Sequence, residues 1–262
     1  MLSTALAYNL VTRDLDKSLA RTASDPAIKR EITAYEKSIR SVKSIDDFLE
    51  NDTVYRVAMK AFGLEDMIYA KGFMRKVLEG GIASRDSFAN KLADKRYREF
   101  ADTFNFAQFG SATTAFSAAQ DGVVKRYVRQ TLEQREGESN EGVRLALYFA
   151  RMAPGLKNAY QVLADPALSK VVRTALNLPE AMATTDIDKQ ARLIESRITF
   201  ADFKDKTKLD AFLKRFASMN DVNQPQPMAT ALASLMAPVG SAGSVGIRPD
   251  LLVGLQSIRF GR

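Results

Sequence analysis

The chain has 262 residues, of which 46% are hydrophobic and 26% are charged, a usage typical of globular proteins. It contains no cysteine and no histidine, which excludes disulfides, thiolate chemistry and the commonest metal ligand and physiological acid–base group. The net charge of +7, from 38 basic and 31 acidic residues, is spread along the chain, whereas a nucleic-acid-binding protein normally concentrates it.

No apolar run reaches the roughly 18 residues that would cross a bilayer. The opening segment, MLSTALAYNLVTRDLDKSLAR, lacks the basic start, long apolar stretch and small-residue cleavage site of a secretory signal. We therefore expect no membrane insertion and a cytoplasmic location.

The first strong helix signal in chain order is SDPAIKREITAYEKSI. Ser24 or Asp25 can cap this helix, and Pro26 suits its first position. Its apolar residues recur at helical spacing and are Ile28, Ile32, Tyr35 and Ile39.

The next segments continue the helical pattern. Ser44 to Asp47 resembles a capping box, and the helix expected over 53–62 is closed by Gly63. The stretches YAKGFMRKVLEGG and DKRYREFADTFNF also repeat apolar residues every three or four positions. Strand-like alternation is almost absent, so the sequence predicts an all-α fold.

An internal repeat is visible at an offset of 114 residues. The segment around DDFLENDTVYRVAMKAFGLEDM resembles NAYQVLADPALSKVVRTALNLPEAM, and the positions that match are mostly apolar. The sequence therefore predicts a tandem duplication of one multi-helix module, packed as a pseudo-symmetric pair. The expected core comprises Ile32, Val57, Phe62, Phe100, Phe104, Val171, Leu176, Phe212 and Phe216.

Four segments are predicted. An N-terminal repeat covers 1–110, and a C-terminal repeat with an inserted helix in NEGVRLALYFARMAPG covers 111–219. A linker rich in Pro, Gly, Ser and Ala follows over 220–248, before a C-terminal helix at 249–262.

The C-terminal helix is the predicted contact site. Leu251, Leu255 and Ile258 share one side of it, and so short an amphipathic helix is marginal alone in water. It needs a surface to cover its apolar side, which can belong to a partner protein or to the helical body of the same chain. We predict these three side chains as protein-interaction residues.

No motif in the sequence meets the requirements of a known catalytic, nucleotide-binding or metal-binding site. The glycines of GSAGSVG have the wrong spacing for nucleotide binding, and DIDKQARLIE lacks the glycine and final carboxylate of a calcium loop. No Ser or Thr has Lys three residues later, as a Ser–Lys hydrolase would require. We predict no catalytic, cofactor-binding or metal-binding residue.

Basic residues are interleaved with aromatic ones at 91–104 and 125–129, a pattern found on nucleic-acid-binding surfaces. Here the aromatic residues fall on the apolar stripe, while Asp94, Glu99 and Asp102 dilute the charge. We interpret both stretches as core positions with a solvated face and expect no nucleic-acid partner.

The segments AYNLVTRDLDKSLARTASDPAIKREI, DDFLENDTVYRVAMKAFGLEDMIYAKGFMRKVL, SFANKLADKRYREFADTFNF and DLLVGLQSIRFGR together resemble an uncharacterised bacterial family of all-helical proteins. The resemblance spans nearly the whole chain. Members of that family have no assigned activity or site residues, and they are commonly encoded among flagellar and motility genes.

The resemblance implies a non-enzymatic structural or assembly protein associated with the flagellum, with flagellar components or a second copy as partners. The alternative is a cytoplasmic adaptor, chaperone or regulator of flagellar biogenesis. Flagellar axial proteins are exported without a cleaved signal and tend to lack Cys and Trp, as this chain does, but its pI near 9.5 departs from that class.

Overall fold

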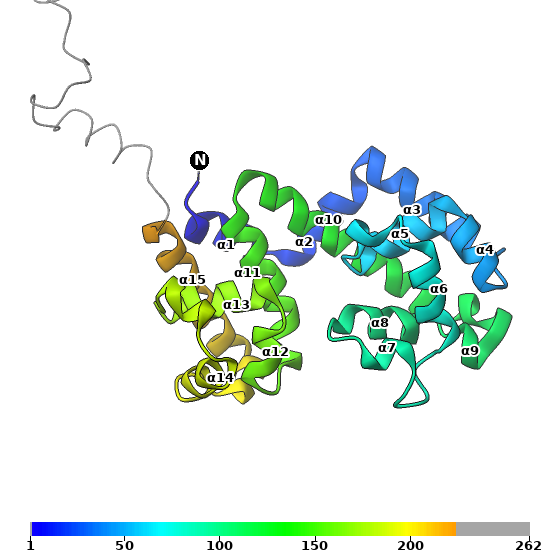
Figure 1. Cartoon of the computed structure of the whole chain (residues 1–262). Helices are drawn as coiled ribbons and strands as arrows, with labels where there is room; N and C mark the ends of the chain where they lie inside the picture. The colour runs from blue at the N-terminus through cyan, green and yellow to red at the C-terminus, as the bar shows by residue number, and fades with distance from the viewer. Residues whose placement is uncertain (1, 224–262) are drawn as a thin grey trace, which may run out of the picture. The chain divides into compact units, whose positions relative to one another are not determined.

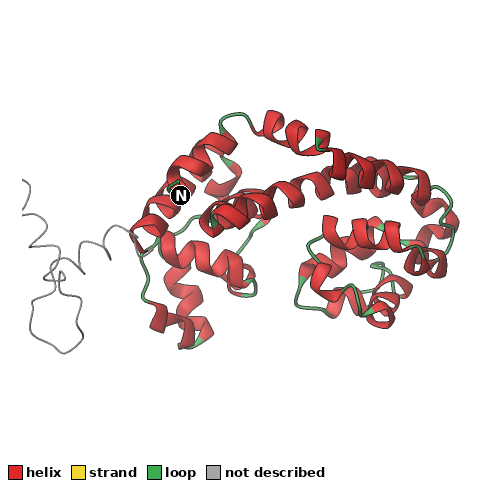
Figure 2. Cartoon of the chain, turned by 90° about the horizontal axis from the view of Figure 1, so that it is seen from above, coloured by secondary structure: helices red, strands yellow, loops and turns green. Residues whose placement is uncertain are grey.

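The computed structural model describes residues 2–223, and within this range the protein is helical with no strand (Figures 1 and 2). This confirms the predicted all-α class. The α-helices are α1 (Thr4–Thr12), α2 (Leu15–Ser24), α3 (Pro26–Ile39), α4 (Ile45–Glu50), α5 (Asp52–Ala61), α6 (Lys71–Glu79), α7 (Phe88–Lys91), α8 (Lys95–Thr103), α9 (Phe106–Phe109), α10 (Val123–Ser139), α11 (Glu141–Met152), α12 (Ala159–Leu163), α13 (Pro166–Ala175), α14 (Ile187–Glu195) and α15 (Lys206–Asn223).

Short 3-10 or π turns join several of these helices. They are η1 (Glu65–Met67), η2 (Gly110–Ala115), η3 (Ala118–Gly122), η4 (Ala153–Gly155), η5 (Glu180–Thr184) and η6 (Phe200–Lys204). No helix within 2–223 combines the length and the apolar character that crossing a bilayer requires.

Helices α3 and α4 begin at the side-chain caps that the sequence predicts. The Asp25 carboxylate accepts hydrogen bonds from the first-turn amides of α3. Ser44 and Asp47 form the predicted capping box of α4. Gly63 adopts φ +67° after α5, the left-handed conformation expected of a helix-terminating glycine.

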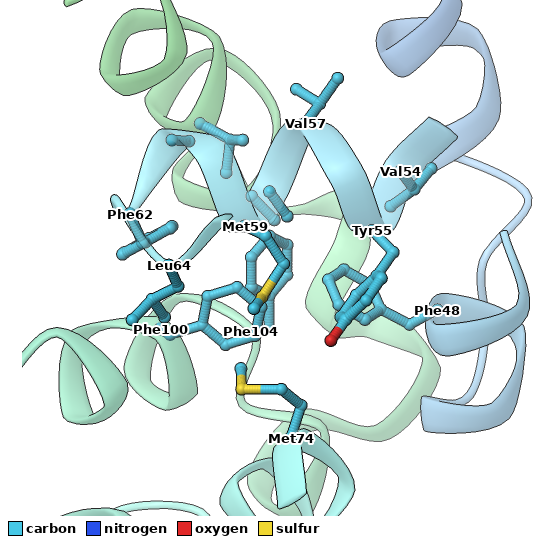
Figure 3. Close-up of a cluster of buried hydrophobic side chains, with 14 of the residues drawn as sticks. Phe48, Val54, Tyr55, Val57, Met59, Phe62, Leu64, Met74, Phe100 and Phe104 are labelled. Atoms are coloured by element: carbon cyan, nitrogen blue, oxygen red, sulfur yellow. The ribbon is translucent and has the colours of Figure 1, made fainter. Parts of the chain in front are cut away.

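The first of two hydrophobic cores is rich in aromatic side chains (Figure 3). Phe100 of α8 and the adjoining Phe104 lie against Phe48 of α4, with ring centroids 5.9 and 4.6 Å from the Phe48 ring. Helix α5 covers this cluster with a nearly continuous buried face. Tyr127 of α10 belongs to the same core, although it lies more than twenty residues along the chain from Phe104.

The second core is built mainly by α11, α13 and α15. Phe149 of α11 stacks on Phe212 of α15, with the ring centroids 5.3 Å apart, and Phe216 of the same core is fully buried. Tyr8 of α1 joins this core from the opposite end of the described chain. Of the predicted core residues, Ile32 and Phe212 are only partly buried, and the others are buried.

The two cores do not divide at the predicted boundary between 110 and 111. Helix α10 packs against both α5 and α11, so Tyr127 contributes to the first core. Helix α1 packs against α11 and α15, so Tyr8 contributes to the second. Apolar matching between the repeats could not reveal these crossings, because it compares positions within the sequence and does not show which helices pack together.

The predicted linker over 220–248 begins too early. Residues 220–223 complete α15, and Asn220 is buried because it packs against α1. The rest of the linker, and the helix expected at 249–262, lie outside the described residues.

Candidate protein-interaction surface

The predicted contact residues Leu251, Leu255 and Ile258 lie outside the described residues, so the structure does not place them. Among residues 2–223, the clearest unpaired apolar surface is on the first helix.

Helix α1 exposes a row of leucines. Leu2, Leu6 and Leu10 are 55%, 48% and 55% exposed. Leu6 and Leu10, four residues apart, share one side of the helix, and Leu2 lies just before the N-cap Ser3. Thr4 and Tyr8, on the other side, are buried. We call Leu2, Leu6 and Leu10 the α1 leucine surface. Isolated exposed leucines are ordinary on soluble proteins, but three exposed leucines within nine residues at the start of one short helix indicate a contact site.

A groove of about 460 Å³ runs beside this surface, between α1, α2 and α10. Apolar side chains from α1 and α10 line it together with charged groups of both signs. The lining residues are Leu2, Ala7, Leu10, Val11, Ser18, Arg21, Thr22, Leu132, Arg135 and Glu136. We call this the α1 groove.

A polar cluster fixes the start of α1. The Asp221 carboxylate at the end of α15 accepts hydrogen bonds from the amides of Thr4 and Ala5, at 2.6 and 3.1 Å. The Asn220 side chain donates to the Thr4 hydroxyl at 3.0 Å, and that hydroxyl donates to Asn140 at 3.1 Å. Because Asn140 caps α11, three helices meet at this point and hold α1 in place.

Gly142 allows α1, α11 and α15 to pack closely. A Cβ at this position of α11 would lie 2.4 Å from Asn220 Nδ2 and 2.8 Å from Thr4 Oγ1, closer than real Cβ contacts allow. The missing side chain therefore lets α1 and α15 approach α11, and glycine is needed here for packing rather than for a turn.

The ionisable groups near α1 are perturbed mainly by burial. Burial, with a contribution from Asp210, raises the pKa of Tyr8 to about 12. Burial also raises the pKa of Glu136 at the edge of the α1 groove, while Arg21 acts in the opposite direction. These shifts follow from packing and do not single out an acid–base pair.

Glu133 of α10 is the most buried carboxylate among the described residues, and it takes part in ion pairs. Its oxygens accept hydrogen bonds from Arg129 at 2.8 Å and from Arg151 of α11 at 2.9 Å, and Arg151 also donates to Gln130. This network joins α10 to α11. Since the guanidinium groups already engage both carboxylate oxygens, we interpret it as structural.

The remaining predictions about chemistry can be placed in the fold. The aromatic residues at 97, 100 and 104 are buried, as predicted, and Asp94 and Glu99 pair with Arg96 and Arg126. Within 2–223 no three acidic side chains gather as a metal ion would require. A second open hollow, of about 590 Å³, lies along the basic face of α3 and is lined by Pro26, Lys29, Arg30, Thr33, Ala34 and Lys37.

The sequence signal for the α1 leucine surface was present but incomplete. The spacing of the leucines is visible in the sequence, yet Ala7, Tyr8 and Val11 make the other sides of the helix apolar too. Only the packing of Tyr8 into the second core decides which side faces solvent.

Comparison with known proteins defines the family. The family described as "Protein of unknown function (DUF1217)" matches residues 61–209, which reach from the end of α5 into α15. The crystal structure of protein AGR_C_984 from Agrobacterium tumefaciens, a structural genomics target, is similar at 47% sequence identity and a TM-score of 0.79. The alignment covers 86% of this chain and 98% of that one. A comparison with curated proteins finds no match. The chain belongs to the DUF1217 family of proteins of unknown function.

Proposed function

We propose that this protein is a non-enzymatic structural or assembly protein of the bacterial flagellum that acts through contacts with other protein surfaces. The observation that carries the proposal is the α1 leucine surface, an exposed apolar row held by a dedicated polar cluster. The flagellar setting rests on the resemblance of the sequence to a family commonly encoded among motility genes.

Two features support contact rather than chemistry. The apolar row lies on a helix that is anchored at its start, so a partner would meet a surface that is already ordered and would lose little conformational entropy on binding. The chain also offers neither histidine nor cysteine for catalysis. The proposed partners are flagellar components or a second copy, with no nucleic acid or cofactor.

The alternative is a cytoplasmic adaptor, chaperone or regulator of flagellar biogenesis, which would use the same surface transiently. The basic pI of about 9.5 favours this reading, because exported axial proteins are usually less basic. Location distinguishes the two: a structural or assembly protein, whether exported or not, is recovered with basal bodies or secreted material, whereas an adaptor stays in the cytosol.

Fractionation tests the proposal. Cells expressing the tagged full-length protein are separated into cytosol, purified basal bodies and secreted material, with a known cytosolic enzyme as control. Recovery with basal bodies or secreted material supports the assembly role. Recovery in cytosol together with altered flagellation in the deletion strain supports the alternative, and normal flagellation in that strain contradicts both.

The predicted contacts of Leu251, Leu255 and Ile258 need a separate test. Deleting residues 224–262 leaves α15 complete. Loss of motility with an unchanged melting temperature supports a role of this segment in assembly. A large fall in melting temperature would show that the segment belongs to the folded core, and its proposed partner role would be withdrawn.

A further inference from the structure

We infer that residues 249–262 dock on the α1 leucine surface of the same molecule and cover it in the free protein. The inference rests on the proposed function, since it names what occupies the proposed contact surface before a partner binds. Its evidence is the point at which the described chain ends, the distribution of exposed apolar side chains, and the length and sequence of the residues that follow.

The described chain ends beside the start of α1. Asp221, in the last turn of α15, accepts hydrogen bonds from the amides at the start of α1, and Asn220 donates to the Thr4 hydroxyl. Helices α1 and α15 pack together here (Figure 1). Since α15 ends at Asn223, residues 224–262 begin within about one helical turn of this contact.

Exposed apolar side chains gather at the same point. Among the described residues ten large hydrophobic side chains are exposed, and four of them are Leu2, Leu6, Leu10 and Val222. Val222 lies in the last turn of α15 and is 76% exposed, so both of the helices that meet here expose apolar side chains. The other six are spread over elements between η1 and α14. The chain therefore leaves the described body at its richest exposed apolar surface.

The sequence of residues 249–262 fits this surface. Leu251, Leu255 and Ile258 recur at helical spacing after Pro249, and so short a helix is marginal in water unless its apolar side is covered. Helix α1 contains no Asp, Glu, Lys or Arg, so covering its leucines takes no charged side chain of α1 out of water. Each apolar side can therefore cover the other.

The covalent tether selects this occupant over a separate molecule. Residues 224–248 are rich in Pro, Gly, Ser and Ala, and a linker of about 25 such residues has an expected average span of about 25–30 Å. Helix α1 is about 14 Å long, so this linker can reach all of the leucine surface. Such a tether supplies an effective concentration of about 1 mM, so a contact with a separate dissociation constant of about 100 μM would be closed about 90% of the time. A surface too small for firm binding of a separate molecule is therefore sufficient for the chain's own end.

The test measures how fast a single cysteine on α1 reacts with a maleimide, because the chain contains no native cysteine. Leu10→Cys is placed in the full-length protein with and without Leu255→Glu and Ile258→Glu, which put charge on the docking side of the segment. We expect the thiol to react about tenfold more slowly when the segment is unaltered. The same factor is expected at every protein concentration, because the contact lies within one molecule.

Two controls match this measurement. Tyr69→Cys reports on a side chain elsewhere that is 80% exposed, and it should react at the same rate with and without the two Glu substitutions. Leu232→Glu with Leu235→Glu places the same two charges in an apolar stretch of the linker, and should leave the Leu10→Cys thiol protected.

Three outcomes overturn the inference. Equal reactivity of the Leu10→Cys thiol with and without Leu255→Glu and Ile258→Glu would show that the surface is open in the free protein. Protection that disappears on dilution would assign the surface to a second copy. Protection that is lost with Leu232→Glu and Leu235→Glu would assign it to the linker.

The same data separate this inference from the proposed function. If the thiol is unprotected but the protein is recovered with basal bodies, this inference fails and the proposed function stands. If the thiol is protected but the deletion strain has normal flagellation, the contact within the chain stands and the proposed function fails.

Discussion

Phe100 is the residue whose removal we expect to cost most in the first core. It is fully buried and contacts the rings of Phe48, Phe62 and Phe104 at centroid distances of 5.0 to 5.9 Å. Phe100→Ala should lower the free energy of unfolding by about 3–5 kcal/mol in urea denaturation. Phe212→Ala should cost less, because Phe212 is only partly buried. An equal or larger cost at Phe212 would contradict this ranking.

Glu133 tests whether the buried ion pairs hold α10 to α11. Glu133→Gln removes the charge that faces Arg129 and Arg151, and should destabilise the protein by about 1.5–3 kcal/mol because the two partly buried guanidinium groups lose a charged hydrogen-bond acceptor. Asp52→Asn is the control: Asp52 also pairs with a cation, Lys71, but is 88% exposed, so its loss should cost under about 1 kcal/mol. Similar urea midpoints for the two variants would refute the structural role of Glu133.

The raised pKa of Tyr8 makes the stability of the folded protein depend on pH in the alkaline range. Its pKa is raised from the usual 10 to about 12, so between these values the unfolded chain loses a proton that the folded chain keeps. The stabilising contribution is therefore complete below pH 10 and declines as pH rises toward 12. Tyr8→Phe should flatten the fall of unfolding free energy in this range, and an unchanged slope would contradict the assignment.

At the scale of elements, several local structures recur at the offset of 114 residues. Gly63 and Asn177 are both left-handed, with φ +67° and +51°, and each follows a buried helix of ten residues. The next amide reaches back five residues in both places, from Leu64 to Met59 and from Leu178 to Arg173. These matches support the predicted tandem duplication, which stays a prediction because the elements around the two copies differ.

The contact between α1, α11 and α15 depends on Gly142. Gly142→Ala places a Cβ within 2.4 Å of Asn220 Nδ2 and 2.7 Å of Thr4 Cγ2, so α1 or α15 must shift. We expect a destabilisation of about 1–3 kcal/mol and faster hydrogen exchange in α1. Gly72→Ala is the control, because its Cβ would meet nothing within 4 Å and should stabilise α6 by about 0.5–1 kcal/mol. Equal exchange in α1 for both variants would contradict the packing role of Gly142.

Sequence patterns predicted the elements whose causes are local. Asp25, Ser44 and Gly63 cap or end helices through their immediate neighbours, so reading the chain was enough. Contacts between distant segments were not predictable in this way. Asp221 reaches Thr4 across more than two hundred residues, and no local signal distinguishes a final helical turn from the start of a linker.

At the scale of the whole molecule, the candidate site also could not be predicted from local sequence patterns alone. A periodic pattern locates the apolar sides of a helix, but the fold decides which of them is covered. Residues 4–12 have apolar residues on every side, and only the second core, assembled from the far end of the described chain, leaves the leucines exposed. The proposed interaction surface is therefore a property of the assembled fold.

Motility of a strain lacking the gene and complemented with Leu6→Glu tests the central claim, that the α1 leucine surface is the functional contact. The variant must match the unaltered protein in abundance and melting temperature, and Tyr69→Glu serves as the surface control. We predict that Leu6→Glu fails to restore swimming in soft agar while Tyr69→Glu restores it. Normal swimming with Leu6→Glu at matched abundance would contradict the claim.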